Sequence, residues 1–135
     1  MGKKTDWFPV LASSELGKRP LAKTRFGEKL VFWRSNDGVV CMPDRCPHRG
    51  AALSLGRVVN NNIACPFHGL EFASGGKCVH MPVEQSQRIP DDFGIRSYAV
   101  CEADGYVWLW RGDESPAAER PPVPKHSGLI GRRYG

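Results

Sequence analysis

Two short segments carry the residues that could do chemistry, and each combines a cysteine with a histidine. They read Cys46-Pro47-His48-Arg49-Gly50 and Cys65-Pro66-Phe67-His68-Gly69, and sixteen residues, 49–64, separate His48 from Cys65. Thiolate and imidazole groups are both metal ligands, and in an intracellular chain closely spaced Cys and His indicate a metal site before a disulfide. The pattern therefore predicts a metal centre held by Cys46, His48, Cys65 and His68.

These donor types fit iron or zinc. Thiolates are soft, charged donors for ferric iron, and neutral imidazoles on a second iron would remove negative charge and raise the reduction potential above that of an all-Cys site. Two Cys and two His could also bind zinc tetrahedrally. A zinc finger usually pairs Cys with Cys and His with His across a ββα unit, whereas each segment here is mixed and no helix follows the second. Iron is favoured, and a zinc-bound interaction module is the distant alternative.

Strand-like runs surround both segments and would have to position them. The first run lies at 7–11. Four pairs of apolar runs follow, each pair flanking turn residues: 29–34 with 39–42, 57–59 with 63–64, 70–73 with 77–79, and 98–102 with 106–110. Such pairs predict β-hairpins. Only 47–55 is a weak candidate for a helix or a loop. The sequence therefore predicts an all-β domain of small antiparallel sheets, with the ligand segments on loops.

Composition sets the limits for a domain of this kind. The chain has 135 residues and a net charge of +5, with its basic residues scattered. This length suits one domain, expected at 1–112, and the charged, Pro-rich stretch 113–135 reads as a linker or tail. A basic surface without clustering suits an acidic redox partner better than nucleic acid. With no apolar run of membrane-spanning length and no secretory signal, we expect no membrane span and a cytoplasmic location.

Both Cys/His segments resemble those of Rieske iron–sulfur proteins. The stretches WFPVL, LVFWR, CPHRGAALSLG and YVWLW extend this resemblance, over roughly residues 7–111, to the N-terminal Rieske domain of Rieske non-haem iron oxygenases. The nearest groups are the aromatic O-demethylases and pheophorbide oxygenases. The resemblance implies a Rieske-type 2Fe–2S cluster on Cys46, His48, Cys65 and His68. It also implies a Rieske fold of three small antiparallel sheets, with the cluster held at the tip by two loops.

The chain departs from the respiratory Rieske proteins at positions beside the predicted cluster. Those proteins carry an extra Cys in each loop, where this chain has Ala51 and Phe67, so the bridging disulfide cannot form. They also use a Ser and a Tyr to donate hydrogen bonds to the cluster sulfurs, where this chain has Leu70 and Phe72. Fewer hydrogen bonds stabilise the reduced cluster less, so we expect a potential of roughly −150 mV, at the low end of the Rieske range.

The function that this resemblance implies is single-electron transfer. As the Rieske domain of an oxygenase, the chain would take electrons from a reductase or ferredoxin and pass them to a mononuclear iron in a catalytic domain. The family builds that iron site with a D/E-x-x-H motif, which is absent from these 135 residues. The chain is therefore not expected to be catalytic on its own. The alternative is a self-contained, low-potential Rieske ferredoxin that shuttles electrons from a reductase.

The remaining Cys, His and Trp residues are expected to be structural. Buried positions in strands are expected for Cys41, Cys78 and Cys101, because unliganded Cys behaves as a small apolar side chain. Surface positions are expected for His80 and His126, and core positions for Trp33, Trp108 and Trp110. Arg49 could tune the electrostatics of the cluster or contact a partner, or it could equally be a solvated loop charge.

Overall fold

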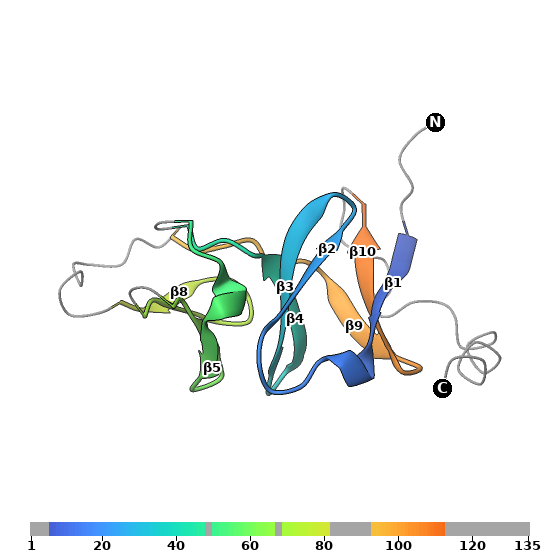
Figure 1. The fold of residues 1–135 in the computed structure, drawn as a ribbon, viewed down its shortest axis with the longest axis horizontal. Helices are drawn as coiled ribbons and strands as arrows, with labels where there is room; N and C mark the ends of the chain where they lie inside the picture. Colours follow the sequence, from blue (N-terminus) through green and yellow to red (C-terminus); the bar gives the residue numbers. More distant parts are fainter. Residues whose placement is uncertain (1–5, 48–49, 67–68, 82–92, 113–135) are drawn as a thin grey trace. The chain divides into compact units, whose positions relative to one another are not determined.

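The computed structural model describes residues 6–47, 50–66, 69–81 and 93–112, and in these ranges the regular structure is β-strands and two short 3-10 helices (Figure 1). His48, His68, Arg49, Phe67 and the predicted tail at 113–135, with His126, lie outside the described residues. The chain divides into two compact units, Met1–Glu15 with Tyr98–Gly135, and Leu16–Ser97. None of the helices in the described ranges has the length and apolar character needed to cross a membrane.

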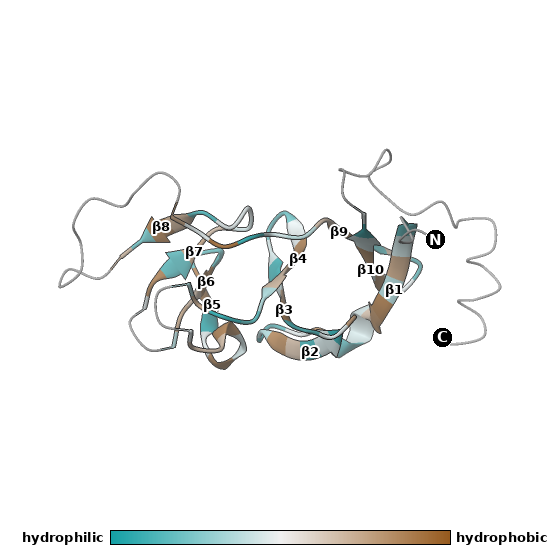
Figure 2. Cartoon of the chain, turned by 90° about the horizontal axis from the view of Figure 1, so that it is seen from above, coloured by the Kyte–Doolittle hydropathy of each residue, from teal (hydrophilic) through white to brown (hydrophobic). Residues whose placement is uncertain are grey.

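The first unit contains one antiparallel sheet with the order β1-β10-β9. Its strands are β1 (Asp6–Ala12), β9 (Val100–Ala103) and β10 (Tyr106–Arg111), and the 3-10 helix η1 (Ser13–Glu15) follows β1. Teal and brown segments follow one another along β1, as expected of a strand with one face buried (Figure 2). The turn from β9 to β10 uses left-handed backbone at Asp104 and Gly105, with φ of 56° and 84°, which suits the twist of a two-residue hairpin. The hairpin predicted at 98–102 and 106–110 is confirmed.

The second unit begins with an antiparallel sheet in the order β2-β3-β4. The strands are β2 (Leu21–Arg25), β3 (Glu28–Ser35) and β4 (Gly38–Pro43). The β3–β4 hairpin is the one predicted from the Asn-Asp-Gly turn, and its register pairs Ser35 with Gly38. Strand β2 was missed, because its sequence LAKTR has few apolar residues and the turn that joins it to β3 is Phe26-Gly27 rather than a common turn pair.

A second antiparallel sheet in this unit has the order β5-β6-β7-β8. Its strands are short, namely β5 (Arg57–Val59), β6 (Asn62–Ala64), β7 (Glu71–Phe72) and β8 (Cys78–His80), and the 3-10 helix η2 (Leu53–Leu55) precedes β5. Both hairpins predicted in this region are confirmed by the pairing of β5 with β6 and of β7 with β8. Of the weak helix or loop candidate at 47–55, the described residues 50–55 form a loop that ends in the 3-10 helix η2. The chain thus has the predicted all-β fold of three antiparallel sheets.

Both sheets of the second unit contribute to one core cluster of buried side chains. The side chains of β3 point alternately to its two faces. Val31 and Trp33 enter this cluster, and Leu30 and Phe32 are buried on the opposite face of the strand. Strand β4 contributes Val40 and Met42, and the other members are Cys46, Leu53, Ile63, Cys65, Leu70, Phe72 and Cys78. The cluster therefore joins the two sheets to both predicted ligand segments.

The structure confirms most, but not all, of the structural expectations for single residues. The thiols of Cys41 and Cys78 are buried and His80 is exposed, as predicted. The expectation of a buried Cys101 was wrong: it is half-buried, on strand β9 at one edge of its sheet. The expectation of core tryptophans holds for the buried Trp33 and Trp108.

Trp110 lies only partly in the core. Its side chain is half-buried, and its ring packs edge-on against that of Trp7, with the ring centroids 5.5 Å apart. The contact with Trp7 thus covers part of the Trp110 indole and leaves part of it accessible.

Candidate metal centre

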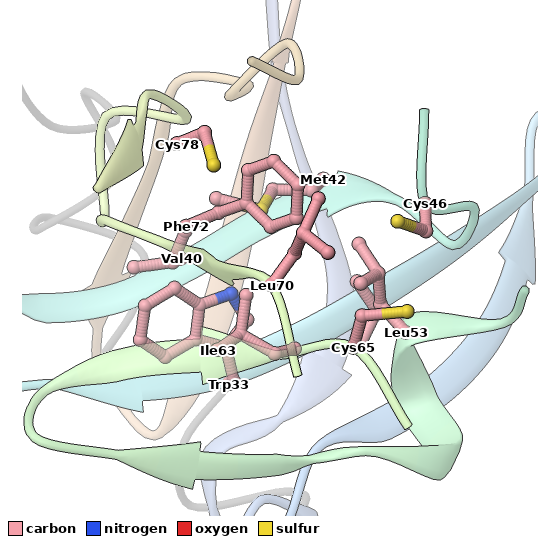
Figure 3. Packing of buried hydrophobic residues seen from close by; sticks show 11 residues of the cluster. Trp33, Val40, Met42, Cys46, Leu53, Ile63, Cys65, Leu70, Phe72 and Cys78 are labelled. Atoms are coloured by element: carbon pink, nitrogen blue, oxygen red, sulfur yellow. The ribbon is translucent and has the colours of Figure 1, made fainter. Parts of the chain in front are cut away.

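The two predicted thiolate ligands, Cys46 and Cys65, lie on loops that leave the ends of strands. Cys46 follows the end of β4, and Cys65 comes directly after β6. Their exposed fractions are 1% and 4%, and both belong to the core cluster of the second unit. In Figure 3 they lie at the same end of this cluster, near Leu53, whereas Cys78 lies at the opposite end. The fold thus brings together two cysteines that are nineteen positions apart in the sequence, as residues 46 and 65.

Both loops are closed by the same pair of backbone hydrogen bonds. In the first loop the amide of Cys46 donates to the carbonyl oxygen of Ala51 at 2.7 Å, and the amide of Gly50 donates to the carbonyl of Cys46 at 2.7 Å. In the second loop the amide of Cys65 donates to Leu70 at 2.8 Å, and that of Gly69 donates to Cys65 at 3.1 Å.

The two segments therefore have one backbone design, although their histidines stand two and three positions after the cysteine. The spacing from Cys to Gly is the same in both segments, and one of the two closing hydrogen bonds joins the Gly amide to the Cys carbonyl. This pairing of a Cys amide with a carbonyl five positions later was not predicted from the sequence, because a backbone carbonyl has no residue-type signal.

Glycine is required at the point where each loop turns back. Gly50 and Gly69 have φ of 78° and 72°, in the left-handed region that side chains rarely adopt. At Gly50 the guanidinium of Arg45 also lies close, since a Cβ built there would be 3.4 Å from its Nε atom. The two glycines thus let each loop turn back toward the core.

The residues after the second loop bury apolar side chains in the core. Leu70 and Phe72 have exposed fractions of 0%, and the ring of Phe72 packs against that of Phe93 with centroids 6.3 Å apart. Neither side chain carries a hydrogen-bond donor. The two positions at which the sequence lacks a side-chain donor are therefore buried in the structure.

The other cysteines have different surroundings. Burial raises the pKa of the Cys41 thiol, and the nearby charge of Glu28 raises it further. Burial also raises the pKa of Cys78, partly opposed by the hydrogen bond from its thiol to the carbonyl of His80 at 3.6 Å. Both residues therefore stay protonated at neutral pH, and a protonated thiol is not a metal ligand. All five cysteines lie in described ranges and none forms a disulfide.

Of the four predicted ligands, the described residues include only the two cysteines. Throughout the described ranges, no three His, Cys, Asp or Glu side chains gather in a way that could hold a metal ion. Positions 48 and 68 lie in sequence between the Cys and the Gly of each closed loop. Two buried thiols on matched loops, each within three positions of an imidazole, fit the donor set that an iron–sulfur centre with mixed ligands requires.

Comparison with known proteins agrees with this geometry. The family model of the Rieske [2Fe-2S] domain matches residues 6–99. The chain is 43% identical over 112 residues to the oxygenase component of dicamba O-demethylase from Stenotrophomonas maltophilia, covering 82% of this chain and 33% of that protein. It is 41% identical over 118 residues to the vanillate O-demethylase oxygenase subunit of a Pseudomonas species, covering 87% of this chain and 32% of that protein.

The structural comparison gives the same result. The crystal structure of apo dicamba monooxygenase superposes with a TM-score of 0.74 at 41% identity, over 83% of this chain and 36% of that one. The chain thus spans about a third of the length of the relatives it matches. Since the family model covers most of the sequence and the fold agrees, the chain belongs to the Rieske [2Fe-2S] domain family, whose members bind a Rieske-type 2Fe–2S cluster.

Proposed function

We propose that this chain transfers single electrons through a 2Fe–2S cluster held by Cys46, His48, Cys65 and His68. The observation that carries the proposal is the pair of matched loops, which present two buried cysteines at one end of the core cluster. A Rieske cluster accepts and releases one electron at a time. This chain would hold the cluster, keep its surroundings apolar and set its potential.

The chain's own residues would perform these tasks in different ways. Cys46 and Cys65 would supply thiolates, whose charge is best tolerated in the interior when it is bound to metal. His48 and His68 would supply neutral imidazoles. The buried side chains of Leu70 and Phe72 would keep the surroundings apolar and offer no hydrogen bonds, which favours a potential at the low end of the Rieske range, roughly −150 mV.

We further infer that the acceptor of these electrons is the mononuclear iron of an oxygenase and that the donor is a reductase or ferredoxin. Support comes from relatives whose names identify them as oxygenase components or subunits. The 135 residues contain no D/E-x-x-H motif, so the iron that reacts with oxygen would be held by residues outside them. On this proposal the protein works in the cytoplasm, and its net charge of +5 suits an acidic electron donor.

The test is electron paramagnetic resonance of the dithionite-reduced protein, with iron and zinc counted on the same sample. We expect a rhombic signal of the Rieske type and about two irons per chain. A colourless protein with about one zinc per chain and no signal would contradict the electron-transfer function and support a structural zinc module. Separate single variants of His48 and His68 to Ala should each abolish the signal.

The donor and acceptor are tested separately. The reduced protein is mixed with the mononuclear-iron domain of an aromatic O-demethylase, and cluster reoxidation is followed in the visible spectrum under oxygen. Reoxidation that depends on this domain supports the oxygenase function. Reoxidation only by a small electron carrier, with no effect of the domain, would support a ferredoxin instead.

A further inference from the structure

An aspartate and a serine form a side-chain clamp across the first ligand loop. The Oδ1 atom of Asp44 accepts a hydrogen bond from the amide of Ser54 at 2.7 Å, and Oδ2 accepts one from the Ser54 hydroxyl at 2.6 Å. Asp44 directly follows β4, and Ser54 lies in η2, so the segment between them contains all of the first ligand loop, including Cys46. The clamp thus joins the two ends of the loop.

Both sides of the clamp are anchored to the rest of the second unit. The amide of Asp44 donates to the carbonyl of Lys29 in β3 at 3.0 Å, which ties the entry of the loop to the sheet. On the exit side Leu53, next to Ser54, has an exposed fraction of 0% and belongs to the same core cluster as Cys46. The loop is therefore held between two fixed points rather than between mobile ends.

The clamp also supplies a helix cap that the local sequence lacks. The N-cap residue of η2 is Ala52. Its side chain has no hydrogen-bond acceptor, so it does not cap the helix. Amides at the start of a helix have no partner within the helix. Asp44 satisfies the Ser54 amide from ten positions earlier in the chain, with a charged acceptor that makes a stronger hydrogen bond than a neutral one.

We propose that Asp44 is a positioning residue for the cluster: through Ser54 it fixes the span of the first loop and hence the place of the Cys46 sulfur. This inference rests on the proposed function, in which Cys46 is a cluster ligand. Because the closure from Cys46 to Ala51 lies between Asp44 and Ser54, loss of the clamp removes the side-chain link that spans this closed turn. The result should be a cluster with a less uniform environment that is lost more readily.

A charged carboxylate close to a ligand loop could instead act on the cluster through its field, and two substitutions separate these roles. Asp44→Asn removes the charge but keeps an oxygen that can accept from the Ser54 amide and an NH₂ group that can donate to the Ser54 hydroxyl. Asp44→Ala removes the charge and both hydrogen bonds. A positioning role predicts that Asn restores most of what Ala loses, whereas a field effect predicts the same change in both.

The experiment measures the linewidth of the reduced-state resonance signal, the midpoint potential, and the half-life of the visible cluster absorption in the presence of an iron chelator. Asp44→Ala should lose its cluster about tenfold faster than the wild type and show a broadened signal, because charge-assisted hydrogen bonds are lost. Asp44→Asn should stay within about twofold of the wild type. The matched control is Asp37→Ala, which makes the same change in the exposed turn between β3 and β4 and should behave as the wild type.

If Asp44→Ala does not accumulate as folded protein, Ser54→Ala takes its place, since it removes only the hydroxyl bond. That variant should lose its cluster about two- to threefold faster than the wild type. Three results would disprove the positioning role of Asp44. They are wild-type behaviour of Asp44→Ala, equal changes in the Ala and Asn variants, and wild-type behaviour of Ser54→Ala. A wild-type protein without a Rieske signal would instead contradict the proposed function itself.

Discussion

The α-carbon of Gly56 lies directly against the carbonyl oxygen of Ala64, so closely that a Cβ on Gly56 would overlap this oxygen. Gly56 ends the 3-10 helix after the first ligand loop, and Ala64 is the residue before Cys65. The exit of one ligand loop therefore packs against the entry of the other. This contact helps to set the separation of the two loops that carry the predicted ligands.

Gly56→Ala should push these two loops apart. Because a Cβ at position 56 would overlap the carbonyl oxygen of Ala64, the backbone of one loop would have to move to accept the substitution. We expect a loss of about 1–3 kcal/mol in stability, the usual cost of an added group in a packed site, and a smaller yield of cluster. Thermal unfolding and iron content of the purified protein measure both effects.

The control for this substitution is Gly75→Ala, because nothing lies within 4 Å of a Cβ built at Gly75 and its φ is not positive. It should match the wild type in stability and iron content. Equal behaviour of the two variants would show that the close approach of Gly56 to Ala64 has no part in holding the loops.

Replacing a histidine ligand by cysteine should lower the potential. His68→Cys would exchange a neutral imidazole for a thiolate and so add negative charge to the site. We expect the midpoint potential to move from roughly −150 mV toward the roughly −400 mV of an all-Cys cluster, with loss of the Rieske spectrum. Potentiometric titration followed by resonance spectroscopy measures the change, and an unaltered spectrum would exclude His68 as a ligand.

Adding a hydrogen-bond donor near the cluster should raise the potential. Phe72→Tyr keeps the aromatic ring and adds one hydroxyl at the position where respiratory Rieske proteins have a donor. If that hydroxyl stabilises the reduced cluster by about 1 kcal/mol more than the oxidised one, the potential rises by roughly 40 mV. Protein-film voltammetry of the purified variant measures this shift.

The matched control for Phe72→Tyr is Phe93→Tyr, which adds the same group to the ring that packs against Phe72. It should leave the potential within the error of the measurement. A rise of the same size in both variants would mean that the effect is a general change in polarity.

The cysteines should differ in reactivity in a pH-dependent way. Burial raises the pKa of Cys41 and Cys78 in the folded protein, whereas an unfolded thiol titrates near pH 8.5. The thiolate is the reactive form, so iodoacetamide at pH 8–9 should label the half-buried Cys101 well before the other two. Peptide mass spectrometry after timed quenching gives the order of labelling.

The same shifts affect stability. Since the folded-state pKa values are raised, the stabilisation from the two protonated thiols is complete below pH about 8.5 and is lost as the pH rises through the folded values. Labelling should accordingly become rapid for all five cysteines in the unfolded chain. Labelling of Cys41 as fast as Cys101 in the folded protein would show that the strand carrying Cys41 opens readily.

Much of this protein could be predicted from residue types and spacing alone. The two mixed Cys/His segments indicated the metal chemistry, because few other sites combine thiolates and imidazoles at such spacing. The hairpins were predictable where Asn, Asp and Gly occupy turns between apolar runs, as they do before Gly38 and at Asp104-Gly105. Local turn chemistry acts over a few residues, so it is visible in the sequence.

The tertiary structure decided what depends on residues far apart in the chain. Sequence reasoning missed strand β2, because its identity comes from pairing with β3 and not from its own composition. It also did not show the clamp from Asp44 to Ser54, the overlap of Gly56 with Ala64, or the common closure of the two ligand loops. Such contacts join a backbone amide or carbonyl, which every residue has, to a partner chosen by the fold. The sequence alone therefore predicted which side chains would bind the cluster, and only the folded chain determined what holds Cys46 and Cys65 in place.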